Sequence, residues 1–310
     1  MIRQDDSAPR AFVIGNVAVD EVLLLRALPA PGQSVHGRIG HTGLGGKGAN
    51  QAIALARTGV ATTLVAAVGA DNHAERVASW VGDEGLTPAF LSRPDLATDR
   101  SIVLTGADGD NVIVTTNACA ASLTTDECAP VLNEARRGEA VLLQGNLRPE
   151  VTAALSHACL QRGLRLVFNP SPFDAAFRDL LPNVDTLFVN APEAESLTGH
   201  SDRRAVDALL HAGANRVVLT LGRDGALLGA PDGVLHVPAA SANVIDVTGA
   251  GDCFLGIALG SALSRGTAVD ETALHHARQA AAHTVERVGA AASFPSRAQV
   301  AALLSGQGAS

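Results

Sequence analysis

The feature that most constrains the fold is a repeated alternation between short apolar runs and segments of helical composition. Ala11–Gly15 is apolar and ends at a glycine; the Ala-rich segment Gly48–Arg57 follows later, before the β-branched run Thr62–Val68. This rhythm is typical of a mostly parallel sheet covered by helices, and it predicts an α/β fold. The rhythm resumes later in the chain, where we expect strands at Ala140–Gln144, Leu164–Phe168, Val184–Val189 and Arg216–Leu221.

Five further segments have the composition and the end signals of helices. Asp71 stands where a capping side chain is expected, before a segment that runs to about Val81. Pro192 lies near the first turn of the predicted helix Pro192–Leu197, a position that proline tolerates well. We expect the other helices at Glu150–Arg162, from Gly249 past Gly260 and at Glu271–Glu286, and short β runs at Ala226–Gly229 and Val234–Val237.

Two segments break this rhythm. Ser34–Gly40 alternates in the manner of a strand, and Ser101–Thr116 consists of two β-rich runs around the turn sequence Asp108-Gly109-Asp110-Asn111. Neither segment has a crossover helix beside it. We therefore expect a small flap of strands, from about 34–42 and 100–117, outside the main sheet of a single domain that spans residues 1–310.

Composition excludes several classes of function. The formal net charge is -8 and aromatic residues make up 3% of the chain, so the basic face and stacking platforms of a nucleic-acid binder are not expected. No apolar run approaches the roughly 20 residues of a membrane helix, and Met1–Arg10 is too polar for a signal peptide. We expect a cytoplasmic enzyme without a membrane or nucleic-acid partner, whose four cysteines are reduced, mostly buried thiols.

The segment Asp246–Asp252 carries the strongest chemical signal. Gly249, Ala250 and Gly251 open a predicted helix, and the unpaired backbone N–H groups of such a start bind anions. Asp252, in the first turn, is suited to take a proton from an attacking hydroxyl. The same residues also suit a tight turn followed by a helix cap, and the segment alone does not separate the two interpretations.

A glycine-rich segment, Gly43–Gln51, opens the helix Gly48–Arg57. Gly43, Gly45 and Gly48 match G-x-G-x-x-G, yet the segment follows the flap and not the first strand, which argues against a dinucleotide site. It is not a Walker A loop either, because Lys47 is followed by Gly48. We interpret the glycines as letting the backbone approach a ligand, whose hydroxyls Lys47 and Asn50 would bind; a flexible loop is the alternative.

Three weaker signals lie near predicted strand ends. Asp20 stands past the first strand, where ligands bind in open α/β sheets, although a surface carboxylate is the simpler interpretation. Asn190 and Glu193 are suited either to hydrated Mg²⁺ or to capping the next helix. Thr220–Gly225 is a turn at the end of a strand. The sequence has no HExxH spacing and no G-x-S-x-G elbow, so it gives no local case for a zinc site or a hydrolase triad.

Together these segments resemble the ribokinase-like (PfkB-type) carbohydrate kinase family. The similarity runs from about Ala11 to Pro295, with Gly45–Ala52 and Asp246–Phe254 resembling the two family signatures. The resemblance implies a three-layer α/β/α fold with a mostly parallel sheet and a small β-strand lid. It also implies an ATP-dependent sugar kinase, with Asp252 as the base and with an anion hole made by Gly249, Ala250 and Gly251.

The resemblance assigns further roles. Positions that contact the sugar are matched by Asp20, Gly46, Lys47, Asn50 and Asn146. The motif that organises Mg²⁺ and phosphate is matched by Asn190 and Glu193, and the segment that holds ATP by Thr220, Gly222 and Gly225. A monovalent-cation site for K⁺ is matched by Asp246, Thr248 and the late segment that contains Gly289. The lid would also form the interface of a homodimer.

The sequence departs from ribokinases at two places. Asn146, in Gln144-Gly145-Asn146, stands where ribokinases usually carry a Glu that contacts the sugar, and Arg278-Gln279 stands near an Asn of the base pocket. Ribose is the expected substrate, and fructose, a phosphorylated hexose, a keto-deoxy sugar acid or a nucleoside are alternatives. A non-catalytic sugar-binding regulatory protein and a nicotinamide-dependent dehydrogenase are the other classes considered. The intact Asp252 segment disfavours both.

Overall fold

A computed structural model describes residues 9–108 and 110–306, so eight residues of the predicted non-signal segment Met1–Arg10 lie outside the described residues. Its main body is built on a nine-stranded sheet of order β13-β12-β11-β10-β9-β8-β1-β4-β5. The seven strands β11, β10, β9, β8, β1, β4 and β5 pair in parallel, and β12 and β13 pair antiparallel. The strands are β1 (Arg10–Ile14), β4 (Ala61–Gly69), β5 (Thr87–Arg93), β8 (Ala140–Gln144), β9 (Arg165–Asn169), β10 (Thr186–Asn190), β11 (Val217–Thr220), β12 (Ala226–Ala230) and β13 (Gly233–Val237).

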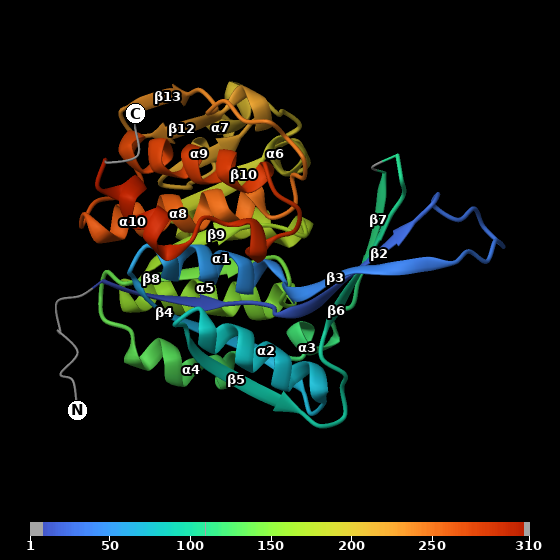
Figure 1. The fold of residues 1–310 in the computed structure, drawn as a ribbon. Coiled ribbons are helices and arrows are strands. Elements are labelled where there is room, and N and C mark those ends of the chain that lie inside the picture. Colours follow the sequence, from blue (N-terminus) through green and yellow to red (C-terminus); the bar gives the residue numbers. More distant parts are fainter. Residues whose placement is uncertain (1–8, 109, 307–310) are drawn as a thin grey trace.

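Helices cover both faces of this sheet, which gives the expected three layers (Figure 1). One face is covered by α1 (Lys47–Arg57), α2 (Asn72–Asp83), α8 (Ala250–Ser264), α9 (Glu271–Val285) and α10 (Arg297–Leu304). The other is covered by α3 (Ala118–Ala121), α4 (Thr125–Glu134), α5 (Pro149–Arg162), α6 (Ala191–Thr198) and α7 (Arg203–His211). Short 3₁₀ turns lie at Ala175–Asn183, Gly222–Asp224 and Ala291–Ser293.

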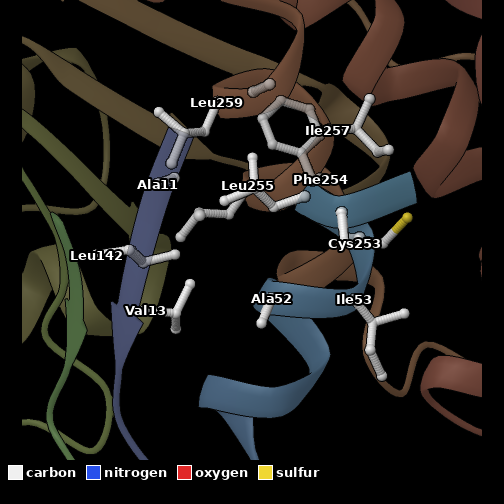
Figure 2. Close-up of a cluster of buried hydrophobic side chains, with 14 of the residues drawn as sticks. Ala11, Val13, Ala52, Ile53, Leu142, Cys253, Phe254, Leu255, Ile257 and Leu259 are labelled. Carbon is white, nitrogen blue, oxygen red and sulfur yellow. The ribbon is translucent and has the colours of Figure 1, made fainter. Parts of the chain in front are cut away.

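The cores on the two faces are aliphatic, as the shortage of aromatic residues requires. Figure 2 shows how α1, through Ala52 and Ile53, and α8, through Leu255 and its neighbours, pack together beside Val13 of β1. This packing fixes the start of α8 against the start of α1. All four cysteines are buried and free, which confirms the prediction of reduced thiols. None of the helices in the described part of the chain is both long and apolar enough to cross a membrane.

A second sheet of four strands, the lid sheet, projects from one side of the body (Figure 1). Its order is β3-β2-β6-β7, with β2 (Ala18–Leu25), β3 (Gly37–Gly45), β6 (Arg100–Thr105) and β7 (Asn111–Thr115). The predicted flap is therefore present, but its boundaries need correction. β3 begins at Gly37 and runs on to Gly45, and the central strand β2 was not expected, because Asp20 and Glu21 interrupt its apolar pattern.

Candidate active site

The start of α8 forms the floor of the candidate site. Gly249 is the N-cap and has φ 75°, a left-handed conformation that favours glycine. A Cβ on Gly249 would lie 2.9 Å from both Ala290 Cα and a ring carbon of Phe294. The Ala250 N–H donates to Val247 O (3.2 Å), whereas Gly251 and Asp252 have no carbonyl one turn earlier within the helix. Of the predicted anion hole, the Gly251 N–H remains available for an anion and the Ala250 N–H does not, while the N–H of Asp252, which was not predicted for this role, is available beside it.

Asp252 is buried at 8% exposure, and amide groups of α1 contact both of its carboxylate oxygens. Asn50 Nδ2 donates to Oδ2 at 3.2 Å, and Gln51 Nε2 donates to Oδ1 at 2.9 Å. The carboxylate therefore has a fixed orientation before any substrate arrives. Its burial beside the open N-terminus of α8 also argues against a purely capping role, since the N-cap position is held by Gly249.

A cleft opens over these residues and joins segments that lie far apart in the sequence. Its walls come from the ends of β9, β10 and β11 and from the starts of α1, α6 and α8. It is lined by Lys47, Asn169, Phe188, Val189, Asn190, Glu193, Thr220, Val247, Gly249, Gly251, Asp252, Phe254 and Leu255. Seven residues predicted from the sequence meet here: Lys47, Asn190, Glu193, Thr220, Gly249, Gly251 and Asp252.

Asp20 lies on the lid strand β2 and is close enough to Asp252 for the two charges to interact. Burial raises the pKa of Asp20 to about 6, a hydrogen bond from Ser101 opposes the rise, and the charge of Asp252 adds to it. The carboxylate occupies space that Gly45 leaves open on β3, because a Cβ there would fall 1.9 Å from Asp20 Oδ1. The structure therefore places a carboxylate of the lid sheet near Asp252, the predicted base.

The other glycines of Gly43–Gln51 serve the fold in a way that differs from the expected one. A Cβ on Gly46 would lie 3.0 Å from Asn16 O and from Ala18 N, and a Cβ on Gly48 would lie 2.6 Å from Asn16 O. The backbone that these glycines approach is the protein's own, where β1 leads into β2. Contact between Gly46 and a ligand stays a prediction.

Asn50 and Asn146 each carry a buried hydrogen-bond acceptor. Asn50 Oδ1 and Asn146 Oδ1 are both buried without a hydrogen-bond partner in the described structure, and Asn146 is only 7% exposed. Asn117 Nδ2 donates to the Asn146 carbonyl at 2.8 Å and holds its backbone. Buried acceptors of this kind are satisfied when a ligand brings hydroxyl donors.

Asn190 and Glu193 form a complete capping box at the start of α6. Asn190 Oδ1 accepts from the Glu193 N–H at 2.8 Å, and Glu193 Oε2 accepts from the Asn190 N–H at 3.0 Å. The capping interpretation is therefore realised. Both side chains also line the cleft, and Glu193 Oε2 lies 3.4 Å from Asn169 Nδ2. A capping role and a position beside a bound phosphate are compatible.

The predicted ATP-binding turn is only partly in the cleft. Thr220 lines it and donates weakly to Val189 O at 3.4 Å, whereas Gly222 and Gly225 do not line it. Gly225, at φ 91°, is needed by the fold, because a Cβ would fall 2.1 Å from Val237 O. The space around a Cβ on Gly222 is open.

Asp246, Thr248 and Gly289 meet beside the start of α8, as predicted. Asp246 Oδ1 accepts from Thr248 N (2.9 Å) and Oγ1 (2.6 Å), and Oδ2 accepts from Gly289 N (2.8 Å). The carboxylate thus ties the segment before α8 to the loop after α9. Among residues 9–108 and 110–306 no group of three or more His, Cys, Asp or Glu is placed to hold a metal ion.

Sequence reasoning missed three polar residues of the site: Gln51, Gln144 and Asn169. Each is buried at 9% exposure or less, and together they form a hydrogen-bonded chain to Asp252. The available signal was a polar residue at the end of a buried strand, Gln144 in AVLLQ of β8 and Asn169 in RLVFN of β9.

Comparison with known proteins agrees with this geometry. The pfkB family carbohydrate kinase model matches residues 9–297. The chain belongs to the pfkB family of carbohydrate kinases. This pfkB-family chain is therefore a sugar phosphotransferase, and the regulatory and dehydrogenase alternatives are set aside.

Proteins similar to this chain align with it over nearly its whole length. A ribokinase of Mus musculus is 30% identical over 306 residues, which covers 94% of each chain. A deoxyribokinase of Salmonella typhimurium is 28% identical over 299 residues, 92% of this chain and 95% of that one. The structure of Arabidopsis thaliana ribokinase complexed with ribose and ATP superposes with a TM-score of 0.85 at 27% identity, covering 96% and 99% of the two chains.

Proposed function

We propose that this pfkB-family kinase is an ATP-dependent ribokinase, which transfers the γ-phosphoryl group of ATP to a hydroxyl of ribose. One observation carries the proposal. Asp252 is buried at the open N-terminus of α8, with both oxygens already oriented by amide donors, in a cleft that Lys47, Asn190 and Thr220 share. The relatives named ribokinase and the complex with ribose and ATP support the choice of substrates.

The chemistry follows from the position of Asp252. Its carboxylate accepts the proton of the sugar hydroxyl while that oxygen attacks the γ-phosphorus and the bond to ADP breaks. The N–H groups of Gly251 and Asp252 stabilise the negative charge on the phosphoryl group in flight.

The donor set around Glu193 fits a hydrated Mg²⁺. Glu193 offers one carboxylate at the cleft wall, and Mg²⁺ in phosphoryl-transfer sites keeps waters and binds mainly to phosphate oxygens. A bound Mg²⁺ would neutralise charge on the phosphates. Asn190 holds Glu193 in place through the capping box, so the protein's own contribution is to fix the carboxylate direction.

The segment around Asp246 offers oxygen donors suited to K⁺, namely its carboxylate, the Thr248 hydroxyl and neighbouring carbonyls. A cation there would add positive charge beside the start of α8. Asp246 also joins this segment to Gly289, so the protein's own hydrogen bonds contribute to the geometry of the loop.

Recognition of the sugar rests on acceptors. Asp20 and the unpaired side-chain oxygens of Asn50 and Asn146 would accept hydrogen bonds from the hydroxyl groups of a sugar. Lys47 lines the neighbouring part of the cleft and provides a donor near the phosphoryl group. The set suits a small neutral polyol better than a phosphorylated hexose or a sugar acid. The proposed partners are a sugar and ATP. We also propose a second copy of this chain, bound through the lid sheet.

The test is ADP release from ATP·Mg²⁺, with and without K⁺, across ribose, deoxyribose, fructose, hexose phosphates, keto-deoxy sugar acids and nucleosides. Wild type and Asp252→Asn are measured side by side. We expect turnover of ribose that falls by roughly a thousandfold or more in Asp252→Asn. Preference for another acceptor would replace ribose in the proposal, and undiminished turnover by Asp252→Asn would refute the assigned base.

A further inference from the structure

A continuous chain of buried amides lies behind the base. Gln144 Nε2, at the end of β8, donates to Gln51 Oε1 on α1 at 2.9 Å. Gln51 Nε2 in turn donates to Asp252 Oδ1 at 2.9 Å and to Asn169 Oδ1 at 3.1 Å. Both glutamines are fully buried. The chain therefore runs from the centre of the sheet to the carboxylate without solvent.

The carboxylate fixes the orientation of each amide. A flipped Gln51 would place Oε1 against two other acceptors, Asp252 Oδ1 and Asn169 Oδ1, and would point Nε2 at the Gln144 donor. A flipped Gln144 would place one acceptor against another. Each hydrogen bond of the chain therefore has a single possible direction, and Gln144 holds Gln51 as Gln51 holds Asp252.

Space for this arrangement depends on Gly15. A Cβ on Gly15 would fall 1.9 Å from Gln144 Oε1, so the absence of a side chain lets the glutamine reach α1. Gln144 Oε1 is itself buried without a hydrogen-bond partner. An unsatisfied buried acceptor costs free energy, and an apolar residue of similar size would avoid that cost. Packing alone therefore does not account for a glutamine here.

The same chain reaches the carboxylate on the other side of the cleft. Asn169 accepts from Gln51 and donates through Nδ2 to Phe188 O at 3.1 Å and to Glu193 Oε2 at 3.4 Å. Gln51 is thus hydrogen-bonded directly to Asp252 and, through the side chain of Asn169, to Glu193. The same buried hydrogen-bond network therefore contacts both carboxylates of the proposed reaction.

We propose that Gln51 is a positioning residue for the base, that Gln144 locks its amide, and that Asn169 joins this support to Glu193. The inference rests on the proposed function, in which Asp252 is the base. A carboxylate has about four lone-pair sites, and Gln51 and Asn50 occupy two of them. The bond on Oδ1 fixes the plane of the carboxylate, so that a free lone pair of Oδ2 meets the sugar hydroxyl.

The inference makes a kinetic prediction for Gln51→Met, which keeps the shape and removes the amide. Because a hydrogen bond to a charged group is lost, we expect kcat to fall by roughly tenfold to a hundredfold while KM for the sugar stays within about twofold. The ionised form of the base also loses a stabilising donor, so the acid limb of the pH–rate profile moves to higher pH by about one unit.

Gln144→Met gives a second variant that leaves Gln51 in place. We expect a shift of the acid limb in the same direction but smaller. Ser156→Ala is the matched control, because Ser156 is equally buried and accepts from Asn183 Nδ2 on the far side of the sheet. This variant loses a partly buried hydrogen bond, so we expect a lower melting temperature and an unchanged pH profile.

A double variant separates positioning from structure. If Gln51 acts through Asp252, Gln51→Met lowers the residual rate of Asp252→Asn by less than about twofold. A wild-type pH profile and kcat for Gln51→Met, or additive losses in the double variant, would overturn the assignment. That result would leave the proposed function intact, which fails separately if Asp252→Asn retains wild-type turnover.

Discussion

The burial of Asp20 has a consequence for pH dependence. Its pKa of about 6 lies above the ordinary 3.8, so between these values the folded state binds a proton that the unfolded state has released. Stability therefore falls as pH rises from about 4 to about 6 and is then constant. We expect Asp20→Asn to raise the free energy of unfolding by about 3 kcal/mol at pH 7.5 and by much less at pH 4, measured in urea.

The same residue predicts how the sugar binds. Ionised Asp20 is the better acceptor, so KM for the sugar should rise as pH falls below about 6 in the wild type and stay high and flat in Asp20→Asn. The exposed carboxylate Asp95 provides the control, since Asp95→Asn should follow the wild type. A wild-type pH dependence of KM in Asp20→Asn would remove Asp20 from the sugar site.

Gly45 tests the placement of that carboxylate without changing its charge. A Cβ on Gly45 meets the Asp20 carboxylate at 1.9–2.3 Å, so Gly45→Ala should displace it and raise KM by roughly tenfold with the fold retained. Gly43→Ala is the control on the same strand. The three atoms nearest to its Cβ belong to the ring of His41, an exposed side chain that can rotate away. Equal KM values for the two variants would contradict the interpretation.

Some residues of the candidate site could be predicted from the sequence and others could not. Asp252 and Asn50 were predicted because they stand in motifs with recognisable spacing. Gln144 and Asn169 were not, since their role depends on β8 and β9 bringing them to Gln51. Contacts between three elements distant in the chain have no local pattern from which to predict them.

At the scale of elements, two glycines at the start of α8 have different roles: we expect Gly249 to be needed for the fold and Gly251 for catalysis. Gly249→Ala forces a left-handed alanine and a contact with Phe294, so we expect a loss of about 2 kcal/mol or more in unfolding free energy. Gly251→Ala meets no atom within 4 Å and should fold as well as the wild type. Its methyl group enters the space beside the anion hole, so kcat should fall roughly a hundredfold.

Urea unfolding and steady-state kinetics on the two variants measure this separation. The expected result is a destabilised Gly249→Ala and a stable but slow Gly251→Ala. A Gly251→Ala enzyme with wild-type kcat would show that the transferred group lies elsewhere in the cleft.

Most elements with a clear period were predicted, but the helices α4, α7 and α10 were missed, although α4 and α10 begin with capping boxes and α7 with an N-cap aspartate. Strands β8 to β11 and helices α2, α5, α8 and α9 lie close to their expected positions. Strand β5 was missed because its sequence, TPAFLSR, contains a proline and has no regular alternation, and α4 because Pro130 interrupts its pattern. Tertiary packing decides such segments.

At the scale of the whole molecule, the layered body followed from the alternation of strands and helices, whereas the lid did not follow completely. Two of its strands read as a hairpin, but β2 joins them only through pairing with β6, which lies some eighty residues later. Strands so distant in sequence are brought together only by the folding of the whole chain. The position of Asp20 on the lid sheet depends on this pairing, so the sequence did not predict it.

The lid sheet has an apolar face that is exposed in the described chain. Val112 and Val114 of β7 are 46% and 58% exposed, and Ile39 of β3 is 76% exposed. Through the pairs Leu104–Val112, Leu23–Leu104 and Leu23–Ile39 these side chains share one face, opposite to the face that carries Asp20. A projecting sheet with such a face is suited to pairing with a second copy of itself.

We therefore expect a dimer in which two lid sheets cover each other. Ile39→Lys with Val112→Lys places like charges on both sides of a two-fold interface, so the variant should sediment as a monomer where the wild type sediments as a dimer. Leu160→Lys, at an equally exposed position of α5, should remain dimeric. Because the lid also carries Asp20, the monomer should bind the sugar more weakly, with a higher KM. A monomeric wild type, or a variant still dimeric, would place the lid face outside the interface.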